Sequence, residues 1–309
     1  MEYRRAVVTG GAGFIGSHLA ERLVREGMQV VVLDDLSVGK RDYVPAGAEF
    51  VLGSVCDPDV VARVVAGTDA VFHLAARVSI RASVAGFYRD AETNLMGTLN
   101  VLRSCASGKV KKFVYSSSMA VYADSPQPVP LAETCRTVPI SPYGVAKLAS
   151  ERYATLVGSQ AGFQAVTLRY FNTYGPRQTF TPYVGVITIF TQRLLRGERP
   201  IVFGDGEQCR DFVYVGDVVE ATCQAMLSGV HGEAINVGSG TGTSVNQVAS
   251  LLCARLRPDI VPSHEPEHPG ELRNSIADIG KARQLLGYEP RHKLEDRIDD
   301  VIAWNRGMI

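Results

Sequence analysis

Short apolar runs alternate with helical patterns along the first half of the chain. Six runs rich in β-branched residues predict strands, at residues 5–9, 29–33, 49–52, 70–74, 112–116 and 165–170. Apolar residues at helical spacing predict helices between them, the longest at residues 15–26, 91–105 and 143–157. Strands that are apolar throughout are typical of sheets covered on both faces. Their alternation with helices predicts an α/β fold, a doubly wound parallel sheet of the Rossmann-like type.

The pattern changes after Gly175 and Pro176, where turn residues multiply and the elements become shorter. We therefore predict a first domain over residues 1–172, to which a segment near 211–250 returns. This segment includes one more strand, at residues 232–238. Residues 173–210 and 251–309 are expected to form a smaller C-terminal lobe that binds the substrate.

Composition excludes several classes of protein. The 309 residues are 46% apolar and 21% charged with a net charge of zero, which is ordinary for a globular protein and leaves no basic block for nucleic acid. No run approaches the ~18 apolar residues of a membrane span. Residues 1–9 lead straight into a strand, so we expect no signal peptide. The six cysteines are scattered without zinc spacing, which favours a reducing cytoplasm and no metal site.

A glycine-rich loop joins the first predicted strand to the first predicted helix. Gly10, Gly13 and Gly16 give the spacing G-x-x-G-x-x-G, which allows a tight turn and close approach of a pyrophosphate to the helix N-terminus. Asp34 and Asp35 end the second strand, roughly 20 residues further on. A carboxylate there accepts hydrogen bonds from ribose hydroxyls and repels a 2′-phosphate, so these residues predict NAD as the cofactor, in preference to NADP.

Tyr143 and Lys147 lie four residues apart at the start of a predicted helix, where Ser141 suits an N-cap and Pro142 a first turn. Positions i and i+4 share one helix face, so both side chains project together. An ammonium beside a phenol favours the phenolate, and the tyrosine can then act as a base nearer neutral pH. A serine of the upstream run 116–118 can hold the reacting oxygen. The spacing predicts a site for hydride transfer.

These residues resemble those of the extended short-chain dehydrogenase/reductases over essentially the full chain, and most of all the UDP-galactose 4-epimerases and related nucleotide-sugar epimerases. The matching pieces follow the family order: the glycine loop, Asp34-Asp35-Leu36-Ser37, His73-Leu74-Ala75-Ala76, Asn94-Leu95-Met96-Gly97-Thr98, Tyr115-Ser116-Ser117-Ser118, Val121-Tyr122, Tyr143-x-x-x-Lys147, Arg169 to Gln178, Phe203-Gly204-Asp205-Gly206 and Arg210 to Asp217.

The resemblance implies roles for individual residues. The catalytic group would be Ser118, Tyr143 and Lys147, the last two also touching the cofactor. The other positions that would contact NAD are Gly10, Gly13, Phe14, Ile15, Asp34, Leu36, Ser37, Ser54, Val55, Leu74, Ala75 and Thr93. The positions that would hold a UDP-sugar are Arg81, Ser118, Asn172, Phe203, Arg210, Arg273 and Ser275.

Three positions depart from the family pattern. Ser54 replaces an aspartate that touches adenine, and Val78 replaces a lysine near the nicotinamide ribose. His268 replaces an arginine that grips the diphosphate, so either Arg273 or His268 itself would have to compensate. The change at Ser54 implies that the adenine contact is weakened or moved, while the expected fold is unchanged.

The residues after Ser118 discriminate among the family's reactions. Related dehydratases and decarboxylases carry an acidic residue there, whereas this chain has Met119 and Ala120, which cannot donate a proton. The resemblance therefore implies a 4-epimerase of carbohydrate metabolism, which inverts C4 of UDP-glucose or UDP-galactose through a 4-keto intermediate with bound NAD.

Several alternatives remain open at this point. Ser275 would leave room for an N-acetyl group, which implies action on the N-acetylated pair as well. Arg81 would suit the carboxylate of UDP-glucuronate. An NAD-dependent sugar-nucleotide oxidoreductase and a non-catalytic NAD-sensing protein are further alternatives. The helices at 91–105 and 143–157 resemble those that pair in family dimers, which implies a homodimer.

Overall fold

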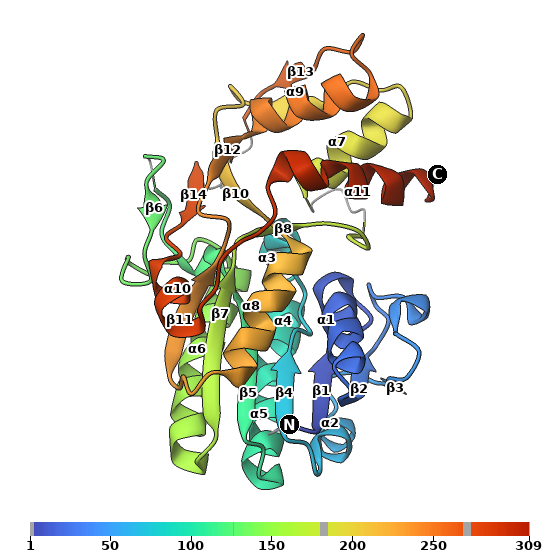
Figure 1. Ribbon diagram of the computed structural model, residues 1–309. Coiled ribbons are helices and arrows are strands. Elements are labelled where there is room, and N and C mark those ends of the chain that lie inside the picture. The colour runs from blue at the N-terminus through green and yellow to red at the C-terminus, as the bar shows by residue number, and fades with distance from the viewer. Residues whose placement is uncertain (1–2, 126, 180–184, 268–272, 309) are drawn as a thin grey trace.

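Seven strands form one parallel sheet in the order β11-β7-β5-β4-β1-β2-β3 (Figure 1). Their bounds are β1 (Arg5–Thr9), β2 (Gln29–Asp34), β3 (Glu49–Leu52), β4 (Ala70–His73), β5 (Lys112–Ser118), β7 (Gln164–Tyr170) and β11 (Glu233–Val237). The structure is a computed structural model that describes residues 3–125, 127–179, 185–267 and 273–308. Because β2 and β3 extend to one side of β1 and β4 to the other, the strand order reverses at β1, where such sheets bind ligands.

Helices cover both faces of this sheet. Successive strand residues point to opposite faces, so Val7 and Val31 belong to one core while Val8 and Val32 belong to the other. The first face carries α2 (Pro58–Val65), α5 (Gly97–Gly108) and α6 (Pro142–Ala161), and the second carries α1 (Phe14–Arg25) and α8 (Val215–Leu227). This two-sided burial explains why the strands are apolar throughout and confirms the predicted fold class.

A smaller lobe stands at the carboxyl ends of the parallel strands (Figure 1). It is built on a second sheet in which β12 (Gly242–Ser244), β10 (Cys209–Tyr214), β14 (Asn274–Ala277) and β6 (Pro130–Leu131) follow one another, and β8 (Asn172–Tyr174) also pairs with β10. A separate two-stranded sheet pairs β9 (Ile201–Phe203) with β13 (Ser263–Glu265). Buried residues of α7 (Val186–Leu195), α9 (Val245–Leu256) and α11 (Leu294–Arg306) form a separate core there.

The predicted elements are confirmed apart from three details. The helix expected over 143–157 is α6, which continues to Ala161, four residues beyond the predicted end. β5 continues to Ser118, two residues beyond the predicted end. The helix expected over 91–105 is instead divided among α4 (Phe87–Ala91), a π-helical turn (Glu92–Met96) and α5. Four short elements lie elsewhere in the chain: α3 (Ile80–Ala85), the 3₁₀ turns at Arg41–Tyr43 and Met119–Val121, and α10 (Gly280–Leu286).

His73, at the end of β4, is fully buried inside a chain of hydrogen bonds. Its Nδ1 lies 2.7 Å from Thr9 Oγ1, and its Nε2 lies 2.9 Å from Thr98 Oγ1. Thr98 donates its proton to the Asn94 carbonyl, and Thr9 Oγ1 accepts from the Ala75 backbone N–H. The ring therefore carries its proton on Nε2 and accepts at Nδ1. Burial, with a smaller effect of the Lys147 charge, lowers the pKa of His73 to about 3.

Acid should therefore weaken the fold through His73. Below the ordinary His pKa of 6.5 the unfolded chain takes up this proton while the native protein does not, until the pH approaches about 3. The free energy of unfolding should fall across that window by about 1.4 kcal/mol per pH unit on account of this residue. Urea unfolding at several pH values should show a flatter pH dependence in His73→Gln than in the wild type. His264→Gln, at an exposed site, is the control, and equal slopes in all three proteins would contradict the assignment.

Candidate active site

The N-terminus of α6 is fixed tightly against the rest of the fold. Ser141 caps it, because its side chain accepts a hydrogen bond from the Gly144 backbone N–H at 3.1 Å. Pro142 occupies the first turn, and the Tyr143 N–H donates to Ser83 Oγ of α3 at 3.3 Å. A Cβ at Gly144 would lie 2.3 Å from the Ala120 carbonyl oxygen, so the helix meets the turn after β5 backbone to backbone. The local geometry thus places Tyr143 over the end of β5.

Ser118, Tyr143 and Lys147 come together as predicted. Ser118 ends β5 and forms a hydrogen bond with the Tyr143 side chain. Lys147 is 1% exposed and donates from Nζ to the Ser116 carbonyl at 2.6 Å. The same Nζ lies 5.8 Å from the centre of the Tyr143 ring and 4.8 Å from that of Tyr115. A phenol, a hydroxyl and an amine therefore share one buried site at the carboxyl edge of the sheet.

The protonation behaviour of this site differs from the sequence-based expectation. Burial raises the pKa of Tyr143 to about 12; the hydrogen bond with Ser118 lowers it, and the charge of Asp90 raises it. Burial also lowers the pKa of Lys147 to about 7, against the opposing effects of Asp90 and Glu151. Desolvation is the largest influence on both groups, so the phenol is less acidic than that of free tyrosine. A further cation beside the ring would favour the phenolate.

The glycine-rich loop has the shape that a dinucleotide requires. Gly10 has a φ of +69°, and a Cβ there would lie 2.7 Å from the Ala75 backbone nitrogen. No side chain caps the N-terminus of α1, which leaves that end of the helix able to meet a phosphate. Asp34 accepts from the N–H groups of Ala12 and Leu36 at 3.0 and 2.9 Å, which holds the loop against the end of β2. These residues fit NAD.

The other residues expected to contact NAD follow the carboxyl ends of neighbouring strands or lie in the turn that faces them. Ser37 follows β2, and Leu74 and Ala75 follow β4. Ser54 and Val55 follow β3, where Ser54 Oγ accepts from the Cys56 N–H at 3.2 Å. Ser54 thus stabilises its own turn. The remaining expected contacts are Gly13, Phe14 and Ile15 at the start of α1, and Thr93 in the π-helical turn.

The residues expected to hold a UDP-sugar are only partly brought together. Asn172 Nδ2 donates to Ser275 Oγ at 3.3 Å, and Ser275 is the register partner of Arg210 across β14 and β10. Arg210 donates to the carbonyls of Cys209 and Arg273, and Arg273 forms a two-pronged ion pair with Asp205 at 2.9 and 2.7 Å.

Three further residues were expected to contact the UDP-sugar or its diphosphate. Phe203 ends β9, and Arg81 lies in α3, although its side chain is outside the described part of the chain. His268, the proposed substitute for a diphosphate arginine, lies outside the described residues altogether.

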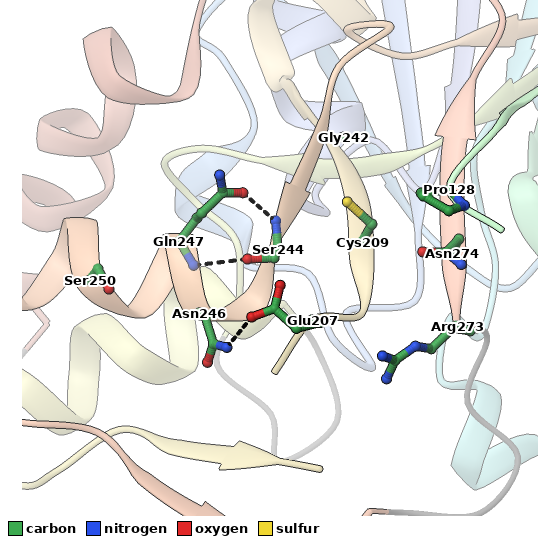
Figure 2. Close-up of a pocket in the computed structure, with 10 residues that line it drawn as sticks. All are labelled: Pro128, Glu207, Cys209, Gly242, Ser244, Asn246, Gln247, Ser250, Arg273 and Asn274. Atoms are coloured by element: carbon green, nitrogen blue, oxygen red, sulfur yellow. Dashed lines mark hydrogen bonds between the residues drawn. The ribbon is translucent and has the colours of Figure 1, made fainter. Parts of the chain in front are cut away.

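A cavity of about 790 Å³ lies on the face of the smaller lobe's sheet that is opposite Arg210 and Ser275 (Figure 2). Cys209 is the register partner of Ser244 and Asn274, and all three line it. Because side chains alternate along a strand, these three face away from Arg210 and Ser275. The cavity is therefore separate from the catalytic group, and the Arg273 guanidinium lines it.

Several buried polar residues next to the catalytic group were missed by sequence reasoning. Asn94 Oδ1 accepts from the Arg77 N–H at 2.9 Å and Nδ2 donates to the Arg77 carbonyl at 3.0 Å, which fixes the segment after β4. Glu151 lies one helical turn beyond Lys147 and forms a buried ion pair with Arg169 at 2.8 Å. Asn94 stands in a recognised family segment, which was a usable signal. The Glu151 pair joins residues 18 apart, and no local pattern marks it.

The described residues include no helix that is both long and apolar enough to cross a membrane. Within the same residues, no group of three or more His, Cys, Asp or Glu side chains is arranged to hold a metal ion.

The chain belongs to the NAD-dependent epimerase/dehydratase family, whose model matches residues 6–238. A putative UDP-glucose 4-epimerase of Methanocaldococcus jannaschii is 36% identical, with 96% of this chain and 97% of that protein covered. The crystal structure of UDP-glucose 4-epimerase from Thermotoga maritima with UDP-glucose superimposes with a TM-score of 0.95 at 41% identity, covering 98% and 99%. A UDP-N-acetylglucosamine 4-epimerase from Methanobrevibacter ruminantium, in complex with UDP-N-acetylmuramic acid, gives 0.94 at 33% identity, covering both chains fully.

Gly10→Ala should damage the dinucleotide loop. The added methyl group would sit 2.7 Å from the Ala75 nitrogen at a φ of +69°. The expected loss of unfolding free energy is about 2–4 kcal/mol, together with weaker NAD binding. Denaturant unfolding and calorimetric titration with NAD would measure both. Gly229→Ala is the matched control, since a Cβ there meets nothing within 4 Å. Equal NAD affinity in the two variants would argue against this loop as the NAD site.

Proposed function

We propose that this protein is an NAD-dependent 4-epimerase of UDP-hexoses, interconverting UDP-glucose and UDP-galactose. The observation that carries the proposal is the buried group of Ser118, Tyr143 and Lys147 at the carboxyl edge of the sheet, where β5 ends. Family membership and the similarity to UDP-sugar epimerases support it. Met119 and Ala120 follow Ser118 and offer no acid for a dehydration.

The NAD site in this proposal lies in residues 1–172 together with the returning segment near 211–250. The residues that would hold NAD are those of the glycine loop and of the neighbouring strand ends: Gly10, Gly13, Phe14, Ile15, Asp34, Leu36, Ser37, Ser54, Val55, Leu74, Ala75, Thr93, Tyr143 and Lys147. When bound, NAD supplies a cationic ring that accepts a hydride from C4 of the sugar and returns it.

Each catalytic side chain then has one task. Tyr143 takes the proton of the sugar 4-hydroxyl and later gives it back, while Ser118 holds the same oxygen by a hydrogen bond. Lys147 in its ammonium form stabilises the Tyr143 phenolate, which burial disfavours. The 4-keto sugar turns over while its diphosphate stays bound, and C4 is inverted when its other face is presented.

We propose that the lobe formed by residues 173–210 and 251–309 binds the UDP-sugar. Asn172, Phe203 and Arg210 would hold the uridine diphosphate, since a guanidinium matches phosphate oxygens with its fixed donors. Ser275 is small, which leaves room for an N-acetyl group, and action on the N-acetylated pair is part of the proposal. Arg81 and Arg273 remain proposed contacts, although Arg273 would first have to leave Asp205.

We also propose a cytoplasmic homodimer. The six cysteines are all free thiols, which suits a reducing compartment. Large apolar side chains are exposed along α4, the π-helical turn and α6, where Phe87 is 65%, Met96 54% and Leu156 53% exposed. A neighbouring groove of about 540 Å³ between α4 and the start of α6 has a mainly apolar lining. A second copy of the chain would cover this surface.

A substrate panel tests the reaction directly. We expect NMR spectra to show inversion at C4 of UDP-glucose, and of UDP-N-acetylglucosamine, without net conversion of NAD to NADH. Inversion of UDP-glucuronate would instead favour the UDP-glucuronate 4-epimerase alternative. Tyr143→Phe should lose about 10²–10⁴-fold in turnover while keeping its circular dichroism spectrum. Tyr153→Phe, exposed on the same helix, should retain turnover. Undiminished turnover in Tyr143→Phe would contradict the proposed mechanism.

Sedimentation velocity tests the dimer. The wild type should sediment with twice the chain mass of 33.4 kDa. Leu156→Asp combined with Met96→Lys should shift it to the monomer, because a charged residue in an apolar interface is costly to bury. Leu52→Asp, at a 63% exposed site on the opposite edge of the main sheet, should leave the mass unchanged. A wild type that sediments as a single chain at micromolar concentration would rule out this part of the proposal.

A further inference from the structure

Asp90 carries a buried carboxylate that is only half satisfied. The residue lies in α4, is 2% exposed, and accepts one hydrogen bond at Oδ1 from Asn94 Nδ2 at 3.0 Å. Its other oxygen, Oδ2, is buried and has no hydrogen-bond partner within the described part of the chain. A buried carboxylate with an unpaired oxygen is costly in free energy, so its presence calls for a compensating cation nearby.

Two cations act on Asp90. Burial raises the pKa of the Asp90 carboxyl. The positive charges of Lys147 and Arg77 lower it, and the effect of Lys147 is the larger of the two. Lys147 projects from α6, the helix against which α4 packs. The Ser150 hydroxyl of α6 donates to the Asn94 carbonyl at 3.1 Å, which ties α6 to the π-helical turn that follows α4. Asp90 and Lys147 are therefore two buried charged groups on neighbouring, packed helices.

The other groups that face Lys147 do not replace Asp90. His73 is kept neutral by a pKa lowered to about 3, and burial raises the pKa of both Tyr115 and Tyr143 above the ordinary range. Glu151 is the second carboxylate. Both of its oxygens accept from Arg169, at 3.0 and 2.8 Å, and one also accepts from Ser117 at 2.5 Å.

Asp90 differs from Glu151 in one respect. No ion pair joins it to any side chain that the structure describes. Asp90 and Glu151 both favour the ammonium form of Lys147, and Asp90 has the larger effect.

We propose that Asp90 is the buried counter-charge of Lys147, a positioning residue that keeps the lysine in its ammonium form beside Tyr143. Its importance for turnover rests on the proposed epimerase function, but its effect on Lys147 does not. Asn94 holds Asp90 in place with one amide hydrogen while its other contacts fix Arg77. Asn94 lies within the π-helical turn that follows α4.

The sign of the effect follows from the charges. Without the Asp90 charge the ammonium form of Lys147 is less favourable, so the pKa of Lys147 falls further below about 7. The same carboxylate disfavours the phenolate, so its removal also lowers the pKa of Tyr143 from about 12. Both groups therefore titrate at lower pH in a protein that lacks this charge.

Asp90→Asn tests the proposal with little change of shape, because an amide oxygen can still accept from Asn94. The primary readout is the ¹³C NMR titration of the Lys147 ε-carbon in protein labelled at lysine, with Lys147→Met used to assign the signal. We expect the midpoint to move to lower pH by about one unit. Asp90→Glu restores the charge and should return the midpoint towards the wild-type value.

Glu92→Gln is the matched control, since it removes an exposed carboxylate two residues further along and should leave the midpoint unchanged. Asp90→Ser provides the same charge change in a smaller side chain if the Asn variant does not fold. An unchanged midpoint in the folded neutral variant overturns the proposal. A shifted midpoint in a protein that inverts no UDP-hexose supports the role of Asp90 and counts against the proposed function alone.

Discussion

The site depends on the burial of a polar face of α6 against β5. One face of this helix carries a phenol, an amine and a carboxylate at intervals of one turn, and the tight packing around Gly144 leaves them little contact with water. Each group consequently needs a partner inside the protein. Lys147 donates to the Ser116 carbonyl, Tyr143 bonds with Ser118, and Glu151 pairs with Arg169. These contacts fix α6 against the carboxyl ends of β5 and β7.

The same burial gives the catalytic pair its protonation behaviour. Desolvation moves the pKa of Tyr143 up and that of Lys147 down, so each neutral form is favoured. A site of this kind responds strongly to any charge that arrives, because low polarity magnifies electrostatic effects. The positive charge that NAD would bring and the charge of Asp90 would then set the pH at which Tyr143 loses its proton and can act as a base. Chemistry at C4 is thereby linked to binding of the dinucleotide.

Much of this architecture could be predicted from sequence because the signals are local. Apolar runs located the strands of the parallel sheet, and the glycine spacing located the loop beside Ala75. The trio was found because Tyr143 and Lys147 share a helix face. The π-helical turn at 92–96 was missed because it depends on Asn94 reaching the backbone of Arg77, 17 residues away. The pKa of Tyr143 was misjudged because burial is a property of the folded protein, and the ion pair of Arg273 with Asp205 links residues 68 apart.

The central claim is that Tyr143 handles only the proton of the 4-hydroxyl, while the hydrogen on C4 travels to the bound dinucleotide and back within a closed site. UDP-glucose deuterated at C4, turned over in ordinary water and followed by NMR, tests this most directly. The account predicts UDP-galactose that keeps its deuterium at C4. Inversion accompanied by exchange of that deuterium for solvent hydrogen would contradict it.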